Sequence, residues 1–279
     1  MKKITVLFVL LFAVFQSFAA EWTAIRSNNP APGQKILISS GIDQSVITFK
    51  TDGFYSTTVN TPQGPAVVIS LDEATPLLLQ GAPDLPKLTA SVIIPDLAEM
   101  QIEVISAQYQ DFENIFVAPG KGNLTRDIDP STVPYTFGPE YTANAFFPGN
   151  LAGTREPYII RDYRGQTVIA YPFQYNPVTR TLRVYTDITV KISSTGHLGE
   201  NPLYRNENDE SIDAGFNAVY QRHFLNAMEN GSRYNPVPEY GNMLVICYSA
   251  FLDAIQPYVE WKKQKIGRAS CRERVYHPV

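Results

Sequence analysis

Nucleophilic catalysis is the first chemistry to consider in this sequence of 279 residues, because it contains both thiols and imidazoles. A cysteine nucleophile needs a histidine within hydrogen-bond reach. The candidates are Cys247, Cys271, His197, His223 and His277. Cys247 ends an apolar run, which is typical of a small buried residue rather than a nucleophile. No convincing pair exists, so the sequence predicts that this chain is not itself a catalyst.

Metal and phosphate chemistry find no better support in the sequence. It contains no glycine-rich phosphate loop, no serine nucleophile elbow and no ligands at metal-binding spacing. The carboxylate pair Asp127 and Asp129, and the pair Asp209 and Glu210, are typical of solvated loop charges. We therefore expect no metal site and no cofactor.

A stretch rich in glycine and proline divides the chain at residues 230–242. Gly231, Pro236 and Pro238 deny it a stable helix or a central strand, so its backbone should be extended and exposed. Exposed backbone is where proteases cut. Arg233 lies in this linker. It is by default a solvated charge and also a candidate recognition residue for a protease.

The amino terminus has the three parts of a secretory signal peptide. Lys2 and Lys3 are followed by an apolar run over residues 4–15 and by small residues up to Ala19. The run is shorter than the roughly 20 residues of a membrane span. We therefore expect cleavage after Ala19, which removes residues 1–19 and leaves no membrane span. The mature chain should be secreted through the periplasm to the cell surface or extracellular space.

The charge of the remaining chain argues against polyanionic partners. The formal charge is −4, to which the two leader lysines contribute +2 and residues 266–279 contribute +2, so the body carries −8. Such a body repels nucleic acid and anionic lipid. We expect neither as a partner.

Most of the chain before the linker consists of strand-length runs separated by turn residues. The runs occupy residues 35–40, 45–49, 54–59, 66–70, 91–95, 101–109, 157–164, 167–175 and 181–192. Gly165 with Gln166, and residues 176–179, are the expected turns of an antiparallel meander. Because no helices alternate with these runs, the sequence predicts a mainly β domain, an antiparallel β-sandwich or jelly-roll-like fold, over residues 20–229.

Helical spacing begins only near the linker. Apolar residues from Ile212 to Ala227 predict one amphipathic helix before it. After the linker, residues 243–247 are typical of a buried strand, and a helix with Ser249 as a possible cap follows. A strand followed by a helix predicts the truncated start of an α/β domain over residues 243–265.

The long segment over residues 118–153 is interrupted repeatedly by proline and glycine. A connection of this length inside a compact domain is usually functional or disordered. Its aromatic residues favour an ordered loop.

Several motifs, taken in order, resemble the pro-region of gingipains, secreted cysteine endopeptidases of Bacteroidetes-type bacteria. They are GAPDLP at 81–86, IIP at 93–95, YRG at 163–165, YNPV at 175–178 and TLRVY at 181–185. Residues 243–247 and 259–265 are similar to the first strand and helix of the family's catalytic domain. The resemblance implies a pro-domain that assists folding of the catalytic domain, its partner in the same chain, and keeps it latent. It also implies that the family's catalytic residues lie downstream, so this chain should be inactive alone.

The resemblance also implies an inhibitory loop at residues 121–127. A protease selective for basic residues has a negative pocket, which a basic side chain on a rigid loop can occupy. Arg126 is the first candidate for this contact. Lys121 and Arg155 are the alternatives.

The linker contains the expected maturation site, between Arg233 and Tyr234. Arg233 suits an Arg-directed member of the family, and the linker contains no lysine. Residues 266–279 depart from the family pattern and are similar to one reading frame of a common sequencing adapter. We expect a non-native tail there, with a genuine basic tail as the alternative.

A second function stays open at this point. Composition alone favours a secreted, non-enzymatic β-sandwich that binds glycan, protein or a surface, as an adhesion module does. The linker and the start of an α/β domain favour the pro-domain.

Overall fold

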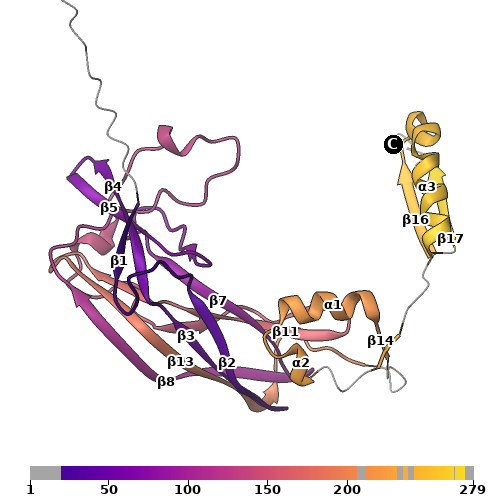
Figure 1. Cartoon of the computed structure of the whole chain (residues 1–279), viewed down its shortest axis with the longest axis horizontal. Helices are drawn as coiled ribbons and strands as arrows, with labels where there is room; N and C mark the ends of the chain where they lie inside the picture. The colour runs from indigo at the N-terminus through magenta and orange to yellow at the C-terminus, as the bar shows by residue number, and fades with distance from the viewer. Residues whose placement is uncertain (1–19, 206–210, 231–234, 238–241, 267, 274–279) are drawn as a thin grey trace, which may run out of the picture. The chain divides into compact units, whose positions relative to one another are not determined.

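The computed structural model describes residues 20–205, 211–230, 235–237, 242–266 and 268–273 (Figure 1). It contains two compact units. The first unit runs to Tyr204 and includes Phe224–Glu229, and the second comprises Arg205–His223 and the chain from Asn230 onward.

The first unit is built from antiparallel sheets. One contains β1 (Glu21–Ala24), β4 (Gly53–Thr61) and β5 (Gly64–Ser70) in that order. The second has the order β10 (Tyr158–Ile160), β11 (Tyr163–Ala170), β7 (Pro86–Ile93) and β6 (Thr75–Pro76), with β9 (Ala152–Thr154) also paired to β11. The third has the order β12 (Phe173–Asn176), β13 (Thr181–Leu198), β3 (Gln44–Lys50) and β2 (Gln34–Ser40), and β8 (Ala98–Phe112) pairs with β13. The predicted mainly β, antiparallel architecture is confirmed.

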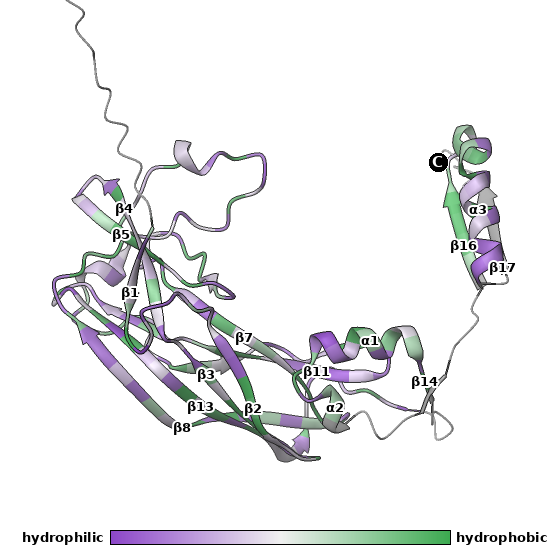
Figure 2. Cartoon of the chain, in the orientation of Figure 1, coloured by the Kyte–Doolittle hydropathy of each residue, from purple (hydrophilic) through white to green (hydrophobic). Residues whose placement is uncertain are grey.

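Alternating side chains give this unit its core. Figure 2 shows hydrophobic and hydrophilic residues mixed along β8 and β13. Leu88 and Val92 of β7 pack with Ile47 of β3 and Ile188 of β13, which joins the second and third sheets face to face. Burying one such side chain contributes about 1.5–3 kcal/mol. A second cluster, around Phe173, packs against the first sheet.

The last strands form only part of the predicted meander: β12 and β13 pair antiparallel across the turn expected at residues 176–179, but the first turn lies elsewhere. The turn before β11 falls at Arg161, whose φ is 45°, and Gly165 lies inside β11. Gly165 is needed for close packing instead, because a Cβ there would lie 2.4 Å from a ring carbon of Phe224. Pro172 interrupts the run predicted over residues 167–175, since it has no N–H for a ladder. As a result β11 and β12 belong to different sheets.

The single helix predicted from Ile212 to Ala227 is also shorter than expected. Ile212 lies in β14 (Ser211–Asp213), α1 spans Ala214–His223, and Ala227 begins α2 (Ala227–Asn230). β14 pairs in parallel with β15 (Asn235–Val237), so part of the predicted linker forms a short strand.

The helical run stops because the next residues bind the edge of β7. Leu225 N donates to Ser91 O at 2.9 Å. Asn226 is fully buried, and its side-chain oxygen accepts from Ile93 N at 2.7 Å while its amide donates to Ile93 O at 2.9 Å. The amide side chain thus replaces a strand partner, which fixes this segment to the sheet.

The second unit ends in a strand, a helix and a strand. β16 (Asn242–Cys247) pairs in parallel with β17 (Arg268–Glu273), and α3 (Leu252–Ile266) lies between them in the chain. Ser249 is not a cap, because it lies inside a 3-10 turn, η4 (Ser249–Phe251). No helix among the described residues is long and apolar enough to cross a membrane. β17 falls in the predicted non-native tail, which stays a prediction.

Candidate functional site

The irregular segment between β8 and β9 forms a long loop that extends from the sheets (Figure 1). Its helical structure consists of two 3-10 turns, η1 (Pro130–Thr132) and η2 (Pro139–Thr142). Aromatic contacts hold its base, as expected. Phe137 stacks on Phe116 with ring centroids 5.8 Å apart, and the Tyr141 hydroxyl donates to Val117 O at 2.8 Å.

The GAPDLP motif explains why this base is rigid. Gly81 N donates to Gly120 O at 2.9 Å, and Gly138 N donates to Gly81 O at 2.9 Å. Gly81 has a φ of 82°, and a Cβ there would lie 3.1 Å from Gly138 N. The position therefore requires glycine. Asp84 N donates to Ala118 O at 2.9 Å, and burial raises the pKa of the Asp84 carboxyl above its ordinary value.

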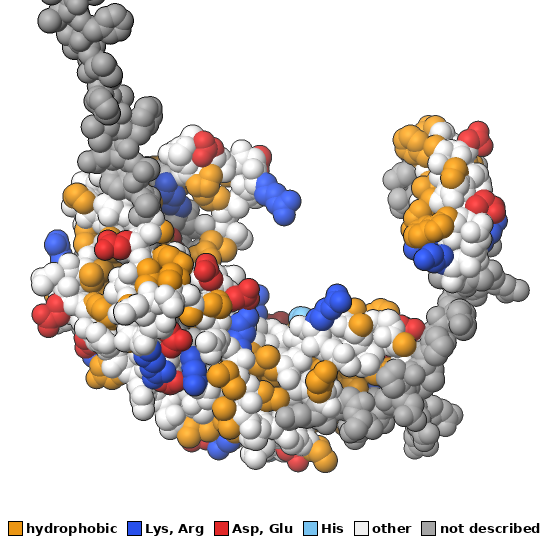
Figure 3. Space-filling view, viewed as in Figure 1, with side chains coloured by type: hydrophobic (Ala, Val, Ile, Leu, Met, Phe, Trp, Pro, Cys, Tyr) orange, Lys and Arg blue, Asp and Glu red, His pale blue; other side chains and the backbone are white. Residues whose placement is uncertain are grey.

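Arg126 lies at an exposed turn of this loop. Ile128 N donates to Thr125 O at 3.1 Å to close the turn, and a hydrogen bond from Thr125 lowers the pKa of Asp127. Asp129 accepts from Ser131 N at 2.8 Å and so begins the next turn. Within the described part of the chain, the Arg126 side chain has no hydrogen bond or ion pair. Figure 3 shows a basic side chain standing out at the outer end of this loop.

The two alternatives to Arg126 differ from it. Lys121 is half-buried, and its Nζ donates to Pro130 O at 2.6 Å and lies 4.3 Å from the centroid of the Tyr135 ring. It therefore holds the loop rather than projecting from it. Arg155 follows β9 and lies on the sheet that contains β7 and β11, so only Lys121 and Arg126 share the loop.

The remaining candidate residues come from other parts of the sequence. Ala19, Arg233 and Tyr234 lie outside the described residues, as do Asp209 and Glu210. Cys247 is half-buried at the end of β16. Within the ranges that the structure describes, no group of three or more His, Cys, Asp or Glu side chains could hold a metal ion.

Arg164 of the YRG motif has a structural role that the sequence did not reveal. Its guanidinium is fully buried and donates to four backbone carbonyls. The distances are 2.8 Å to Pro95 O, 2.7 Å to Ala98 O, 2.6 Å to Glu200 O and 3.0 Å to Asn201 O. Loss of water lowers the pKa of Arg164, and the nearby charge of Asp96 opposes that shift. One side chain therefore joins two loops to β11.

An antiparallel β-domain with an exposed basic loop braced at its base is what the resemblance to gingipain pro-regions predicts. The Propeptide_C25 family matches residues 25–224, and the chain belongs to this family. It is a gingipain-type pro-region, and the adhesion module is not favoured.

Its relatives include gingipains of Porphyromonas gingivalis. Gingipain R1 is 41% identical over 252 residues, which are 89% of this chain and 25% of that protein. Gingipain R2 of strain W83 is 36% identical over 260 residues, which are 92% of this chain and 34% of that protein. The chain thus spans about a quarter to a third of the length of these relatives.

Two solved structures have the same fold. One is the complex of the Porphyromonas gingivalis RgpB pro- and mature domains, where the matched chain has a TM-score of 0.64 and 36% identity, with 70% of this chain and 98% of that chain covered. The other, on the zymogenic latency of gingipain K, has a TM-score of 0.53 and 21% identity, with 63% and 100% covered. The second likeness supports the fold alone.

Proposed function

We propose that this chain is the N-terminal part of a secreted gingipain-type cysteine endopeptidase precursor. Its β-domain assists folding of the catalytic domain that follows in the same chain and keeps that domain latent. The likeness to the RgpB complex supports this, because the matched chain there is almost fully covered and the complex contains a pro- and a mature domain. The pro-domain itself needs no cofactor.

The exposed Arg126 is the observation that carries the inhibitory role. A guanidinium fits a carboxylate in a basic-selective pocket through paired hydrogen bonds. Arg126 is free to make them, whereas Lys121 already binds Pro130 O. The bracing of the loop reduces the conformational entropy that binding would cost. Arg126 therefore enters the protease pocket, and Lys121 supports the loop from behind.

The precursor is organised in five parts under this proposal. A signal peptide (1–19) precedes the pro-domain (20–229), a linker with the maturation site (230–242) and the start of the peptidase domain (243–265). Residues 266–279 are a non-native tail. Signal removal after Ala19 delivers the chain to the periplasm and onward to the cell surface or medium.

The function is tested by adding the purified chain to a mature Arg-directed gingipain. Hydrolysis of an Arg-peptide reporter should fall in a saturable, dose-dependent way, while the chain alone should hydrolyse neither Arg- nor Lys-peptide reporters. Full protease activity in the presence of about 10 μM chain would contradict latency, because a specific complex with sub-micromolar affinity is saturated there.

Maturation is a separate prediction. In a full-length precursor, Arg233→Ala should leave the pro-domain attached, because the basic residue that an Arg-directed protease recognises is gone. The wild-type mature enzyme should begin at Tyr234 by N-terminal sequencing. Arg222→Ala, which removes an exposed arginine of α1 outside the linker, is the control and should be processed normally. Normal processing of Arg233→Ala, or another mature N-terminus, would refute the assignment.

A further inference from the structure

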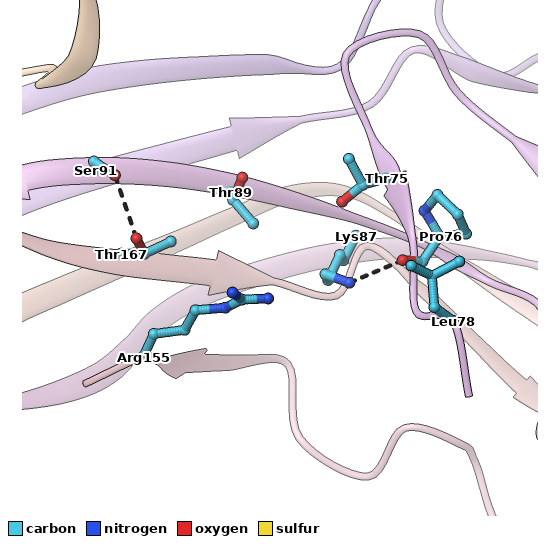
Figure 4. Close-up of a pocket in the computed structure, with 8 residues that line it drawn as sticks. All are labelled: Thr75, Pro76, Leu78, Lys87, Thr89, Ser91, Arg155 and Thr167. Carbon is cyan, nitrogen blue, oxygen red and sulfur yellow. Dashed lines mark hydrogen bonds between the residues drawn. The ribbon is translucent and has the colours of Figure 1, made fainter. Parts of the chain in front are cut away.

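The sheet that contains β7 and β11 has a polar outward face (Figure 4). Along β7, Lys87, Thr89 and Ser91 alternate with buried apolar residues, so all three lie on the face away from the core. These side chains line a pocket of about 370 Å³. The pocket is therefore built on regular strands rather than on a loop.

Neighbouring strands complete the pocket. Thr167 of β11 lies opposite Ser91, and their hydroxyls are 3.3 Å apart. Thr75 of β6 lies opposite Lys87. Arg155 follows β9, and its backbone N–H donates to Thr167 O at 3.0 Å. Segments distant in sequence thus bring two cations and several hydroxyls to one place.

The two cations lack a carboxylate partner among the described residues. Lys87 Nζ donates to Pro76 O at 2.8 Å, which uses one of its three N–H groups. Figure 4 shows the Arg155 guanidinium extended toward Lys87. Burial and the charge of Arg155 both lower the pKa of Lys87. Two neighbouring positive charges without a counterion are unfavourable, and an anion between them would remove the repulsion.

We propose that this pocket binds a phosphate or sulfate group. The ammonium of Lys87 and the guanidinium of Arg155 have more N–H donors than the two oxygens of a carboxylate can accept, and the hydroxyls of Thr75 and Thr89 also line the pocket. A tetrahedral anion has enough acceptors for them. The volume is at the lower end of that of small-ligand sites. The anion comes either free or as an ester on a larger molecule. This site is distinct from the Arg126 loop, so the proposal does not rest on the inhibitory role.

Calorimetric titration of the whole chain with inorganic phosphate tests the proposal, with sodium chloride keeping the ionic strength constant. Saturable binding is expected, with a dissociation constant on the order of 1 mM. Lys87→Met and Arg155→Met should each weaken it about tenfold or more, because each removes charge-assisted hydrogen bonds. Arg155 is exposed and outside the strands, so its variant should keep the fold even if Lys87→Met does not.

Lys191→Met is the matched control. It removes one positive charge from β13, where Lys191 pairs with Glu103 at 2.7 Å, and should bind phosphate as the wild type does. Glycerol 3-phosphate distinguishes the sources: tighter binding than inorganic phosphate indicates an ester, and equal binding indicates the free anion. Absence of saturable binding, an equal response to acetate, or wild-type binding by Arg155→Met would overturn the proposal.

Discussion

Arg164→Met should lower the free energy of unfolding of the first unit by about 3–5 kcal/mol. Methionine fills similar space, but the carbonyls of Pro95, Ala98, Glu200 and Asn201 lose the donor that the fully buried guanidinium supplies. An acceptor left without a partner away from water costs about 1–3 kcal/mol, and relaxation of the loops with hydration of the exposed residues Glu200 and Asn201 recovers part of the total. Urea unfolding measures the loss, and thermal unfolding should show a midpoint lower by roughly 10 °C.

The control is Arg126→Met, which makes the same chemical change on an exposed loop. Its free energy of unfolding should stay within about 0.5 kcal/mol of the wild type. If Arg164→Met unfolds at the same urea concentration as this control, the buried guanidinium does not hold the two loops to β11.

Arg126→Ala should raise the inhibition constant of the chain against a mature Arg-directed gingipain about 100-fold. An arginine that fills a desolvated pocket is the kind of residue whose truncation costs about 2–4 kcal/mol of binding free energy. Lys121→Ala should have a smaller effect, since it removes the hydrogen bond to Pro130 O and the contact with the Tyr135 ring, which hold the loop but do not enter the pocket. Reporter hydrolysis at increasing chain concentration gives all three constants.

Arg155→Ala is the control that separates the position of the lost charge from the loss of charge itself. It removes an arginine from the same domain but not from the loop, so its inhibition constant should equal that of the wild type. An unchanged constant for Arg126→Ala, with a raised one for Arg155→Ala, would move the inhibitory contact to the sheet face.

Most strands were predictable because their signal is local. Alternation and turn residues placed residues 35–40 and 45–49 close to the observed β2 and β3. The helical spacing of residues 252–259 likewise predicted α3. These patterns reflect the period of side chains along one element, which does not depend on the partner.

The errors arose where a residue type serves a distant contact. Gly165 resembles a turn glycine, but it is small because the Phe224 ring packs against it. The helical pattern continued past His223, but hydrogen bonds to Ser91 and Ile93 of β7 end it. Sequence spacing contains no information about which strand edge is free to accept a segment from far along the chain.

The candidate sites were likewise predictable where the signal is local and unpredictable where it depends on distant contacts. The loop that we propose to be inhibitory was predicted from the family motifs and from the absence of a regular period in its sequence. Deciding between its two basic residues required the structure, because Lys121 differs from Arg126 only in the contacts that Lys121 makes. The Lys87 pocket could not be predicted, because its residues meet only through strand pairing. Thr167 reaches it because β11 pairs with β7, and Arg155 reaches it because β9 pairs with β11.

The alternation along β7 also limits how this protein can change over evolutionary time. Leu88 faces the core and Lys87 faces the pocket, so each can be substituted without disturbing the other. A single-residue insertion or deletion within the strand is different, because it moves every side chain beyond it to the opposite face. It would place Thr89 or Ser91 in the core and an apolar residue in the pocket at the same time. Divergence in this strand should therefore proceed by substitution, and length changes should be confined to the loops on either side.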